Sequence, residues 1–296
     1  MLKNNTLFNT DLCVLNILCN FAPIETMQLK AKTIAITNAH QRIASELAMF
    51  EPIELSQAVK IKLMKRTEIK FLVNVAELSG LLSMLSDRFM VQTIGQNRSQ
   101  WYTTTYLDTA NLSMYAEHRN KHSFRQKVRL RTYALANETY FEVKTSNNGN
   151  TNKQRIQLQN GSLWSKSNAV STFLLDTSSY RVGQLQPSIV SEFNRITLVD
   201  TQHAERLTID TDIQMQNVRT MQTLSLPNVA VVELKCEKTP SVYTAKMVEQ
   251  VHLEQSSFSK YCIGVALTDA NAEKRGFEQQ LFLLKKISQR VTNSVF

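Results

Sequence analysis

The sequence predicts an α+β fold dominated by an antiparallel β-sheet that can close on itself. Many short segments alternate charged and apolar residues, as half-buried strands do, and helical segments with apolar stripes fall between them. A third observation is a hairpin pattern, in which strands at 125–133 and 139–146 are separated by the turn-like sequence ALANE. A chain of 296 residues with only 7 Gly and 5 Pro can form one large domain or two modest ones without disordered linkers.

The first 45 residues lack this charged alternation, so we expect residues 1–45 to form a non-core extension and residues 46–296 to form the folded domain. The apolar run LCVLNILCNFA at 12–22 is too short to span a bilayer. The run favours an N-terminal extension with helical character over an export signal, because Asn16 and Asn20 interrupt it and no clear cleavage site follows. The four cysteines form no C-x-x-C pair, which suits a reducing compartment, and we expect a cytoplasmic protein.

Helical spacing over 38–50 places Ile43, Leu47 and Phe50 on one side. A strand at 64–73 follows, and Asn74 then caps a helix, with Glu77 completing a capping box. The apolar stripe of that helix is Leu78, Leu81, Leu82 and Leu85. Further strands are expected at 101–109, 188–199, 204–215 and 228–238, and further helices at 162–175, 241–254 and 272–291, the last with the stripe Phe277, Leu281, Leu284 and Ile287.

Charged residues share one face on several of these strands. In RQKVRLRTY, the strand period of two sends Arg125, Lys127, Arg129 and Arg131 to the same side. On one strand alone, a solvated outer face is the ordinary interpretation, but its repetition weakens that interpretation. The other same-face groups are Arg66, Glu68 and Lys70; Glu142 and Lys144; Lys153 and Arg155; Arg206, Thr208 and Asp210; and Glu233 and Lys235, with Arg195 on a further strand.

This pattern favours a basic lumen. The opposite strand faces carry apolar residues that helices could cover, so a closed sheet would hold its charges inside. Arginine suits phosphate oxygens, and the net charge of +9 favours an anionic partner. The carboxylates Glu68 and Glu142 have two open interpretations: salt bridges that relieve repulsion between cations, or binding of Mg²⁺ or Mn²⁺ together with phosphate.

The motifs KRTEIKF, YLDT, RQKVRLRTY, FEVK, KQR, RLTID, VVELK and FSKY occur in the order found in VTC domains. The chain therefore resembles these polyphosphate polymerase domains of the triphosphate tunnel metalloenzyme (CYTH-like) superfamily, from about Phe50 to about Tyr261. A single motif of this kind is weak, whereas the ordered set is specific.

The resemblance implies an antiparallel eight-stranded β-tunnel, a closed barrel with a charged lumen flanked by helices. It also implies transfer of the γ-phosphate of ATP to a growing polyphosphate chain, with Mn²⁺ or Mg²⁺ as cofactor. Glu233 would be the principal metal ligand, with Glu68 and Glu142 as weaker candidates. The expected catalytic cations are Lys70, Arg129, Arg131, Lys144, Arg195 and Arg206, and the expected substrate-binding residues are Arg125, Lys127, Lys153, Arg155, Lys235 and Lys260.

Two positions depart from the patterns of the superfamily. Arg66 replaces the first glutamate of E-x-E-x-K, as is usual in the VTC branch, which argues against the hydrolytic and cyclase branches. Phe193 stands in FNR where Tyr-x-Arg is common, so one hydroxyl contact to phosphate is missing and activity could be lower.

Three other functions remain as alternatives. One is a triphosphate or tripolyphosphate hydrolase of the same fold, and another is a non-catalytic polyphosphate-binding subunit. A third, a nucleic-acid-binding barrel, is disfavoured because the basic strands alternate with Val and Leu rather than with exposed aromatic residues. We expect no nucleic-acid partner and no transmembrane segment, and a separate membrane protein could be a partner.

Overall fold

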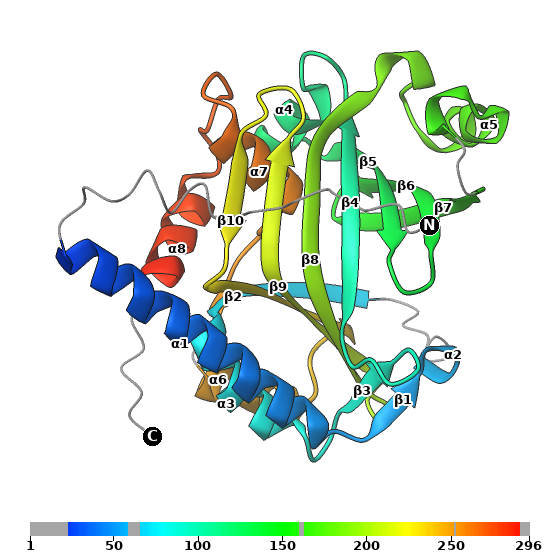
Figure 1. Cartoon of the computed structure of the whole chain (residues 1–296). Helices are drawn as coiled ribbons and strands as arrows, with labels where there is room; N and C mark the ends of the chain where they lie inside the picture. The colour runs from blue at the N-terminus through cyan, green and yellow to red at the C-terminus, as the bar shows by residue number, and fades with distance from the viewer. Residues whose placement is uncertain (1–22, 59–65, 160–162, 252, 291–296) are drawn as a thin grey trace, which may run out of the picture.

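The computed structural model describes residues 23–58, 66–159, 163–251 and 253–290 (Figure 1). Its helices, apart from three short 3₁₀ turns, are α1 (Pro23–Ala48), α2 (Leu55–Ala58), α3 (Leu78–Leu85), α4 (Ser113–Arg119), α5 (Asn168–Thr177), α6 (Val242–Gln250), α7 (Lys260–Thr268) and α8 (Glu278–Gln289). Its strands are β1 (Pro52–Glu54), β2 (Arg66–Asn74), β3 (Met90–Thr93), β4 (Gln100–Asp108), β5 (Phe124–Tyr133), β6 (Glu138–Asn147), β7 (Asn150–Leu158), β8 (Gln186–Asp200), β9 (Glu205–Asn217), β10 (Thr223–Leu226), β11 (Val229–Glu237) and β12 (Glu254–Gln255).

The strands form one large sheet in the order β12-β2-β11-β9-β8-β4-β5-β6-β7, with β10 on β9, and β3 on β8 and β1. All pairs are antiparallel except the parallel pair β1–β3. The predicted α+β architecture is therefore confirmed. The predicted closed barrel is not, since no backbone pairing among the described residues joins β2 or β12 to β7. On its outer side β2 pairs with the short β12 instead.

The open sheet nevertheless curls strongly. The Glu68 carboxylate on β2 lies 3.1 Å from Lys144 Nζ on β6, although five strands separate β2 from β6 in the sheet. A contact of this length requires the two sides of the sheet to bend toward each other. The sheet therefore has a concave face that side chains, rather than backbone hydrogen bonds, span.

Helices cover the convex face, as the apolar alternation predicts. One core cluster packs α1 and α3 against β2, β9 and β11, and its members Leu78, Leu81, Leu82 and Leu85 are fully buried. A second cluster packs α5 against β5 and β6 through Val170 and Leu174. Burial of these apolar side chains from water drives the layering.

The predicted helices are found with shifted ends. Ile43, Leu47 and Phe50 are buried as expected, and so are Phe277, Leu284 and Ile287 around α8. Asn74 does cap the next turn, since its side chain accepts a hydrogen bond from the backbone N–H of Ala76 at 3.0 Å, but that turn is a short 3₁₀ helix ahead of α3.

The division of the chain at residue 46 stays a prediction. Ala39 and Ile43 on α1, which precede it, are buried against the core. The apolar run 12–22 lies outside the described residues. None of the described helices has both the length and the apolar character of a membrane span.

Helix α7 packs on the concave face, a feature that strand alternation did not predict. Its Tyr261, Cys262, Ile263 and Val265 join an apolar cluster with residues of β4, β8 and β9. Asp108, the third residue of the YLDT motif, holds the helix in place: it accepts hydrogen bonds from the Tyr261 hydroxyl and from backbone N–H groups at the start of α4. An apolar plug therefore fills part of the concave face, and the charged residues line the rest.

Gly264 allows α7 to approach the sheet. A Cβ atom there would lie 3.0 Å from Ile189 Cγ2 and 3.2 Å from Met215 Sδ. We predict that Gly264→Leu lowers the free energy of unfolding by roughly 1–3 kcal/mol, because extra carbons overpack this contact. Urea denaturation measures the change.

The matched control is Gly80→Ala in α3, where a Cβ atom meets nothing within 4 Å. It should keep or raise stability, because alanine favours helix over glycine by up to about 1 kcal/mol. Equal stability of wild type and Gly264→Leu would mean that α7 does not pack closely on the sheet.

Candidate functional site

Four carboxylates on the concave face each contact two cations. This arrangement follows from the strand register, which sets the charged positions of neighbouring strands opposite one another: Glu233 faces Lys70, and Lys235 faces both Glu68 and Arg206. The resulting groups are Glu233 with Lys70 and Lys235, Glu68 with Lys70 and Lys144, Glu142 with Arg129 and Lys153, and Asp210 with Arg195 and Lys260.

Glu233 on β11 is held between two lysines. Its Oε1 lies 2.8 Å from Lys70 Nζ, and its Oε2 lies 2.8 Å from Lys235 Nζ. Burial by itself would raise the pKa of Glu233, but Lys235 and Lys70 outweigh it and hold that pKa well below its ordinary value. Glu233 is therefore a permanent anion at neutral pH.

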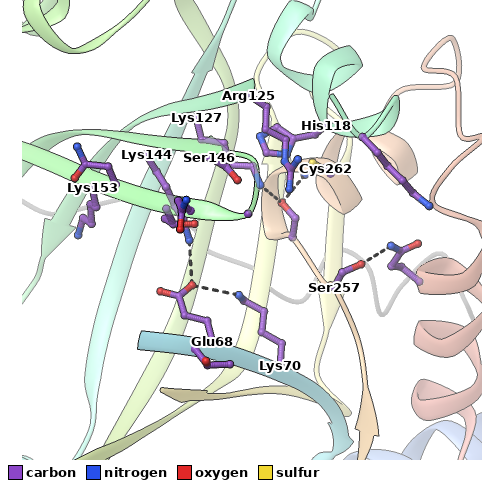
Figure 2. A pocket seen from close by; sticks show the side chains of 18 of the residues that line it. Glu68, Lys70, His118, Arg125, Lys127, Lys144, Ser146, Lys153, Ser257 and Cys262 are labelled. Atoms are coloured by element: carbon purple, nitrogen blue, oxygen red, sulfur yellow. Dashed lines mark hydrogen bonds and ion pairs between the residues drawn. The ribbon is translucent and has the colours of Figure 1, made fainter. Parts of the chain in front are cut away.

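Glu68 spans the open side of the sheet (Figure 2). Its Oε2 lies 3.1 Å from Lys144 Nζ and 3.8 Å from Lys70 Nζ. Burial and the nearby Glu233 oppose its ionisation, yet Lys144, Lys235 and Lys70 lower the pKa of Glu68 overall. Glu68 and Glu233 thus form a pair of ionised carboxylates joined through Lys70.

Glu142 is buried between two cations of the β5–β6–β7 sheet. It lies 2.7 Å from Arg129 Nη2 and 2.6 Å from Lys153 Nζ. Burial opposes its charge, but Arg129, Arg131 and Lys153 lower the pKa of Glu142 to about 2. Burial and the nearby Arg129 in turn lower the pKa of Lys153 to about 7.

Asp210 organises the deepest group, where β8, β9 and α7 meet. It accepts two hydrogen bonds from the Arg195 guanidinium, at 2.6 and 2.7 Å, and it also contacts the Lys260 ammonium at the start of α7. These two cations outweigh burial and lower the pKa of Asp210 to about 2. The sequence placed Asp210 on the charged face but did not identify it as a site residue, because its partners come from other elements.

Two cations of the concave face, Arg131 and Lys127, have no carboxylate within ion-pairing distance in the described part of the chain. Arg131 is 7% exposed, donates to Thr104 Oγ1 at 3.3 Å and lies over the Tyr102 ring. Lys127 donates to Ser259 Oγ at 3.1 Å, and burial lowers the pKa of Lys127 to about 8. An ammonium group and a guanidinium group without a carboxylate partner favour the approach of an anion.

The remaining predicted cations lie toward the edges of the face. Arg206 Nη2 donates to the carbonyl of Ala58 at 2.7 Å. Arg155 is exposed and stacks over the Tyr140 ring with 4.3 Å to its centroid. Arg125 donates to the carbonyl of His122 at 2.7 Å and lines the cavity described next. The side chain of Arg66 lies outside the described residues.

A cavity of about 1420 Å³ opens along the charged face (Figure 2). It is bounded on one side by β2 and on the other by the β5–β6–β7 strands, with the start of α7 and of α8 between them. The charged residues around it are Glu68, Lys70, Lys121, Arg125, Lys127, Lys144, Lys153 and Lys238, so cations greatly outnumber carboxylates. His118 also lines it, and burial together with Lys127 and Arg125 lowers the pKa of His118 to about 2, which keeps this ring neutral.

Phe193 is fully buried and does not line the cavity. It stacks on Tyr102 with ring centroids 5.5 Å apart, and Arg195 and Lys260 lie over its face at 5.2 and 4.1 Å. The aromatic ring thus supports two cations of the Asp210 group even without a hydroxyl.

The residues at this site suit a divalent ion only in combination with a ligand. No group of three or more His, Cys, Asp or Glu side chains in the described ranges could hold a metal alone. Glu68 and Glu233 offer two ionised carboxylates, and Mg²⁺ is commonly held by one or two carboxylates together with substrate phosphates. Glu142 lies in the separate Arg129–Lys153 group.

Comparison with known proteins supports the resemblance seen in the motifs. The family model described as VTC domain matches residues 65–268, which is more than half of the chain. A search of curated proteins found no match to this chain.

Solved structures that resemble this chain do so distantly. A candidate adenylate cyclase from Bacillus halodurans is 16% identical, with a TM-score of 0.44, covering 66% of this chain and 96% of that one. A candidate adenylyl cyclase from Hippeastrum, for which a dominant triphosphatase activity is described, is 14% identical, with a TM-score of 0.42, covering 70% and 98%. The PH1819 protein of Pyrococcus horikoshii is 11% identical, with a TM-score of 0.39, covering 68% and 98%. These resemblances are too distant to bear on the activity of this chain.

The pairing at Asp210 leads to a stability prediction. Asp210→Ala removes the shared partner of Arg195 and Lys260 and leaves two buried cations facing each other, so we expect a loss of about 3–5 kcal/mol in the free energy of unfolding. Urea denaturation without added phosphate measures this loss. The control is Glu249→Ala, which replaces an exposed glutamate on α6 and should change the free energy of unfolding by less than about 0.5 kcal/mol. A similarly small change in Asp210→Ala would refute the assigned role.

Proposed function

Since the chain belongs to the VTC domain family, we propose that it is a polyphosphate polymerase that transfers the γ-phosphate of ATP to a growing polyphosphate chain. The observation that carries this proposal is the excess of cations on the concave face. Each of the four carboxylates is already shared by two cations, and Lys127 and Arg131 have no carboxylate partner in the described part of the chain. A linear polyanion is the ligand that such a long cationic face fits.

The charged face supplies alignment and charge neutralisation. Phosphoryl transfer needs the attacking and leaving oxygens in line, and it needs cations around the transferred group. Arg195 is fixed by its two hydrogen bonds to Asp210, and Arg129 is fixed by Glu142, so both guanidinium groups are oriented before substrate arrives. The attacking group is a terminal phosphate oxygen of the acceptor, so the proposal requires no serine, cysteine or histidine nucleophile.

A divalent ion, Mn²⁺ or Mg²⁺, fits beside Glu233 and Glu68 when phosphate oxygens complete its ligands. When bound, such an ion would neutralise charge on the phosphoryl oxygens. Lys70 contacts both of these carboxylates, and each also pairs with a second cation, Glu233 with Lys235 and Glu68 with Lys144. Glu142 is the weakest of the three proposed ligands, because Arg129 and Lys153 already saturate it.

Hydrolysis of triphosphate is the second candidate, and the open sheet favours it. A tunnel that excludes water favours transfer of the phosphoryl group to a phosphate acceptor over its transfer to water. The described strands do not close, and side chains alone span the gap between β2 and β6. Water could enter there and accept the phosphoryl group.

The cellular setting is also part of the proposal. Both described cysteines, Cys236 and Cys262, are free and buried, which suits the reducing cytoplasm, where ATP is available. A separate membrane protein is a candidate partner in this proposal.

The product of ATP turnover distinguishes the two candidate activities. We expect the wild-type protein, given ATP, Mn²⁺ and a pyrophosphate primer, to release ADP and to form polyphosphate ladders on a gel. Release of orthophosphate without any chain product at saturating ATP would refute the polymerase and support the hydrolase.

Glu233→Gln should reduce Mn²⁺-dependent ADP release by about a hundredfold or more, because a metal contribution of several kcal/mol to the transition state is lost. Binding of tripolyphosphate should persist, since the change leaves Lys70 and Lys235 without their shared anion and makes the field more positive. Calorimetric titration measures binding, and Glu249→Gln serves as control. Unchanged turnover in Glu233→Gln would exclude Glu233 as the essential ligand.

Arg131→Ala should slow turnover about ten- to a hundredfold, because each charge-assisted hydrogen bond to phosphate contributes roughly 1.5–3 kcal/mol. Arg131→Lys should recover only part of the rate, since lysine keeps the charge but lacks the planar fork of arginine. Steady-state ADP release measures both variants. Full activity of Arg131→Ala would remove Arg131 from the proposed site.

A further inference from the structure

A second cavity, of about 640 Å³, adjoins the charged cavity and has a different chemistry. The two cavities share Glu68, Lys70, Ser257 and Gln280 in their linings. Gln280 Nε2 donates to Ser257 Oγ at 2.6 Å, so this hydrogen bond lies where the cavities meet. A ligand whose anionic part lies near Lys70 could therefore extend into the second cavity.

The lining of the second cavity is mostly neutral. Apart from the shared residues, it consists of Glu254, Gln255, Ser256, Gln279, Phe282 and Leu283. The one additional charge, Glu254, is neutralised by Lys286 at 2.6 Å and Arg290 at 2.5 Å. Amides, hydroxyls and an aromatic ring suit an uncharged polar group with a flat face, and the volume lies within the usual range for small-molecule sites.

Phe282 is the main apolar feature of this lining. Its side chain is 71% exposed, whereas the neighbouring Leu283 and Leu284 on α8 are buried, at 8% and 4%. The ring therefore contributes little to the core and is open to stacking. A planar heterocycle stacked on an exposed aromatic ring gains affinity without needing a particular hydrogen-bond pattern.

Two buried polar atoms of the same lining, Ser256 Oγ and Gln280 Oε1, have no hydrogen-bond partner among the residues that the structure describes. Ser256 is also adjacent to the charged site, because its backbone N–H donates to the Lys70 carbonyl at 2.8 Å. Buried polar atoms are normally satisfied, so these two atoms are candidate hydrogen-bond partners for a polar ligand in the cavity.

We propose that the second cavity binds the nucleoside of the triphosphate whose phosphates enter the charged cavity. The base stacks on Phe282, and the side-chain amides and hydroxyls contact the base and the ribose. This proposal rests on the proposed function, and it adds a means of telling donor from acceptor. An inorganic polyphosphate has no nucleoside, so only the nucleotide donor can occupy both cavities.

The test compares the binding of ATP and of inorganic tripolyphosphate to the full-length protein, with Mg²⁺ present, by calorimetric titration. The variant is Phe282→Ala, which alters a residue that lines the second cavity only. We expect its affinity for ATP to fall about tenfold, as loss of one base–aromatic stack predicts, while its affinity for tripolyphosphate stays within about twofold.

Two further variants sharpen this test. Phe282→Trp keeps a stacking surface and should bind ATP at least as well as wild type. The matched control is Leu175→Ala, which removes another exposed apolar side chain, 53% exposed on α5 at the convex face, and should bind both ligands normally.

The outcomes separate this inference from the proposed function. Equal ATP affinity in wild type and Phe282→Ala, with tripolyphosphate binding intact, overturns the nucleoside site and leaves the phosphate site standing. An equal loss of both ligands in Phe282→Ala also overturns it, because the change would then act on phosphate binding. Failure of wild type to bind tripolyphosphate contradicts the proposed function and the nucleoside site with it.

Discussion

Sharing of carboxylates between cations is the interaction on which the concave face depends. Strand alternation gathers lysine and arginine side chains on one side of a curled sheet, where they repel one another in partly dry surroundings. Glu68, Glu142, Asp210 and Glu233 each bridge two of them, and all four bridges join different strands or a strand and a helix. The bridges stabilise the face, but its cations still outnumber its carboxylates. The excess cations repel one another when no ligand is bound, and they are available to bind an anion.

The apolar residues of the concave face explain why the charged region is confined. Helix α7 occupies the part of the face formed by β4, β8 and β9, and Asp108 fastens it through the Tyr261 hydroxyl. Its first residue, Lys260, reaches Asp210 at the boundary between the two regions. The helix therefore both fills the space that a closed barrel would leave hollow and delivers one cation to the charged region.

The arrangement of the two cavities suggests how one face could treat two polyanions differently. The lining of the larger cavity holds seven lysine and arginine residues, whereas the smaller one offers amides, hydroxyls and the Phe282 ring. Lys70 and Glu68 lie where the two meet, which is also where two carboxylates lie close together. In the proposed function, Lys70 would thus couple phosphate binding, metal affinity and recognition of the nucleotide donor. The pKa of Lys70 is raised, because Glu233 and Glu68 outweigh the effect of burial.

The sequence by itself determined which side chains share a face. Arg125, Lys127, Arg129 and Arg131 lie together because Cβ atoms alternate along any strand, whatever its partners are. It also predicted the helices with strong apolar stripes, such as Leu78 to Leu85. It did not predict α7, because Tyr261 to Ala266 are buried almost all round and show no stripe. Only the tertiary structure decided that Asp210 pairs with Arg195 and Lys260, that Glu68 reaches Lys144, and that the sheet stays open, because these contacts depend on strand register and on the curl of the whole sheet, which no local spacing encodes.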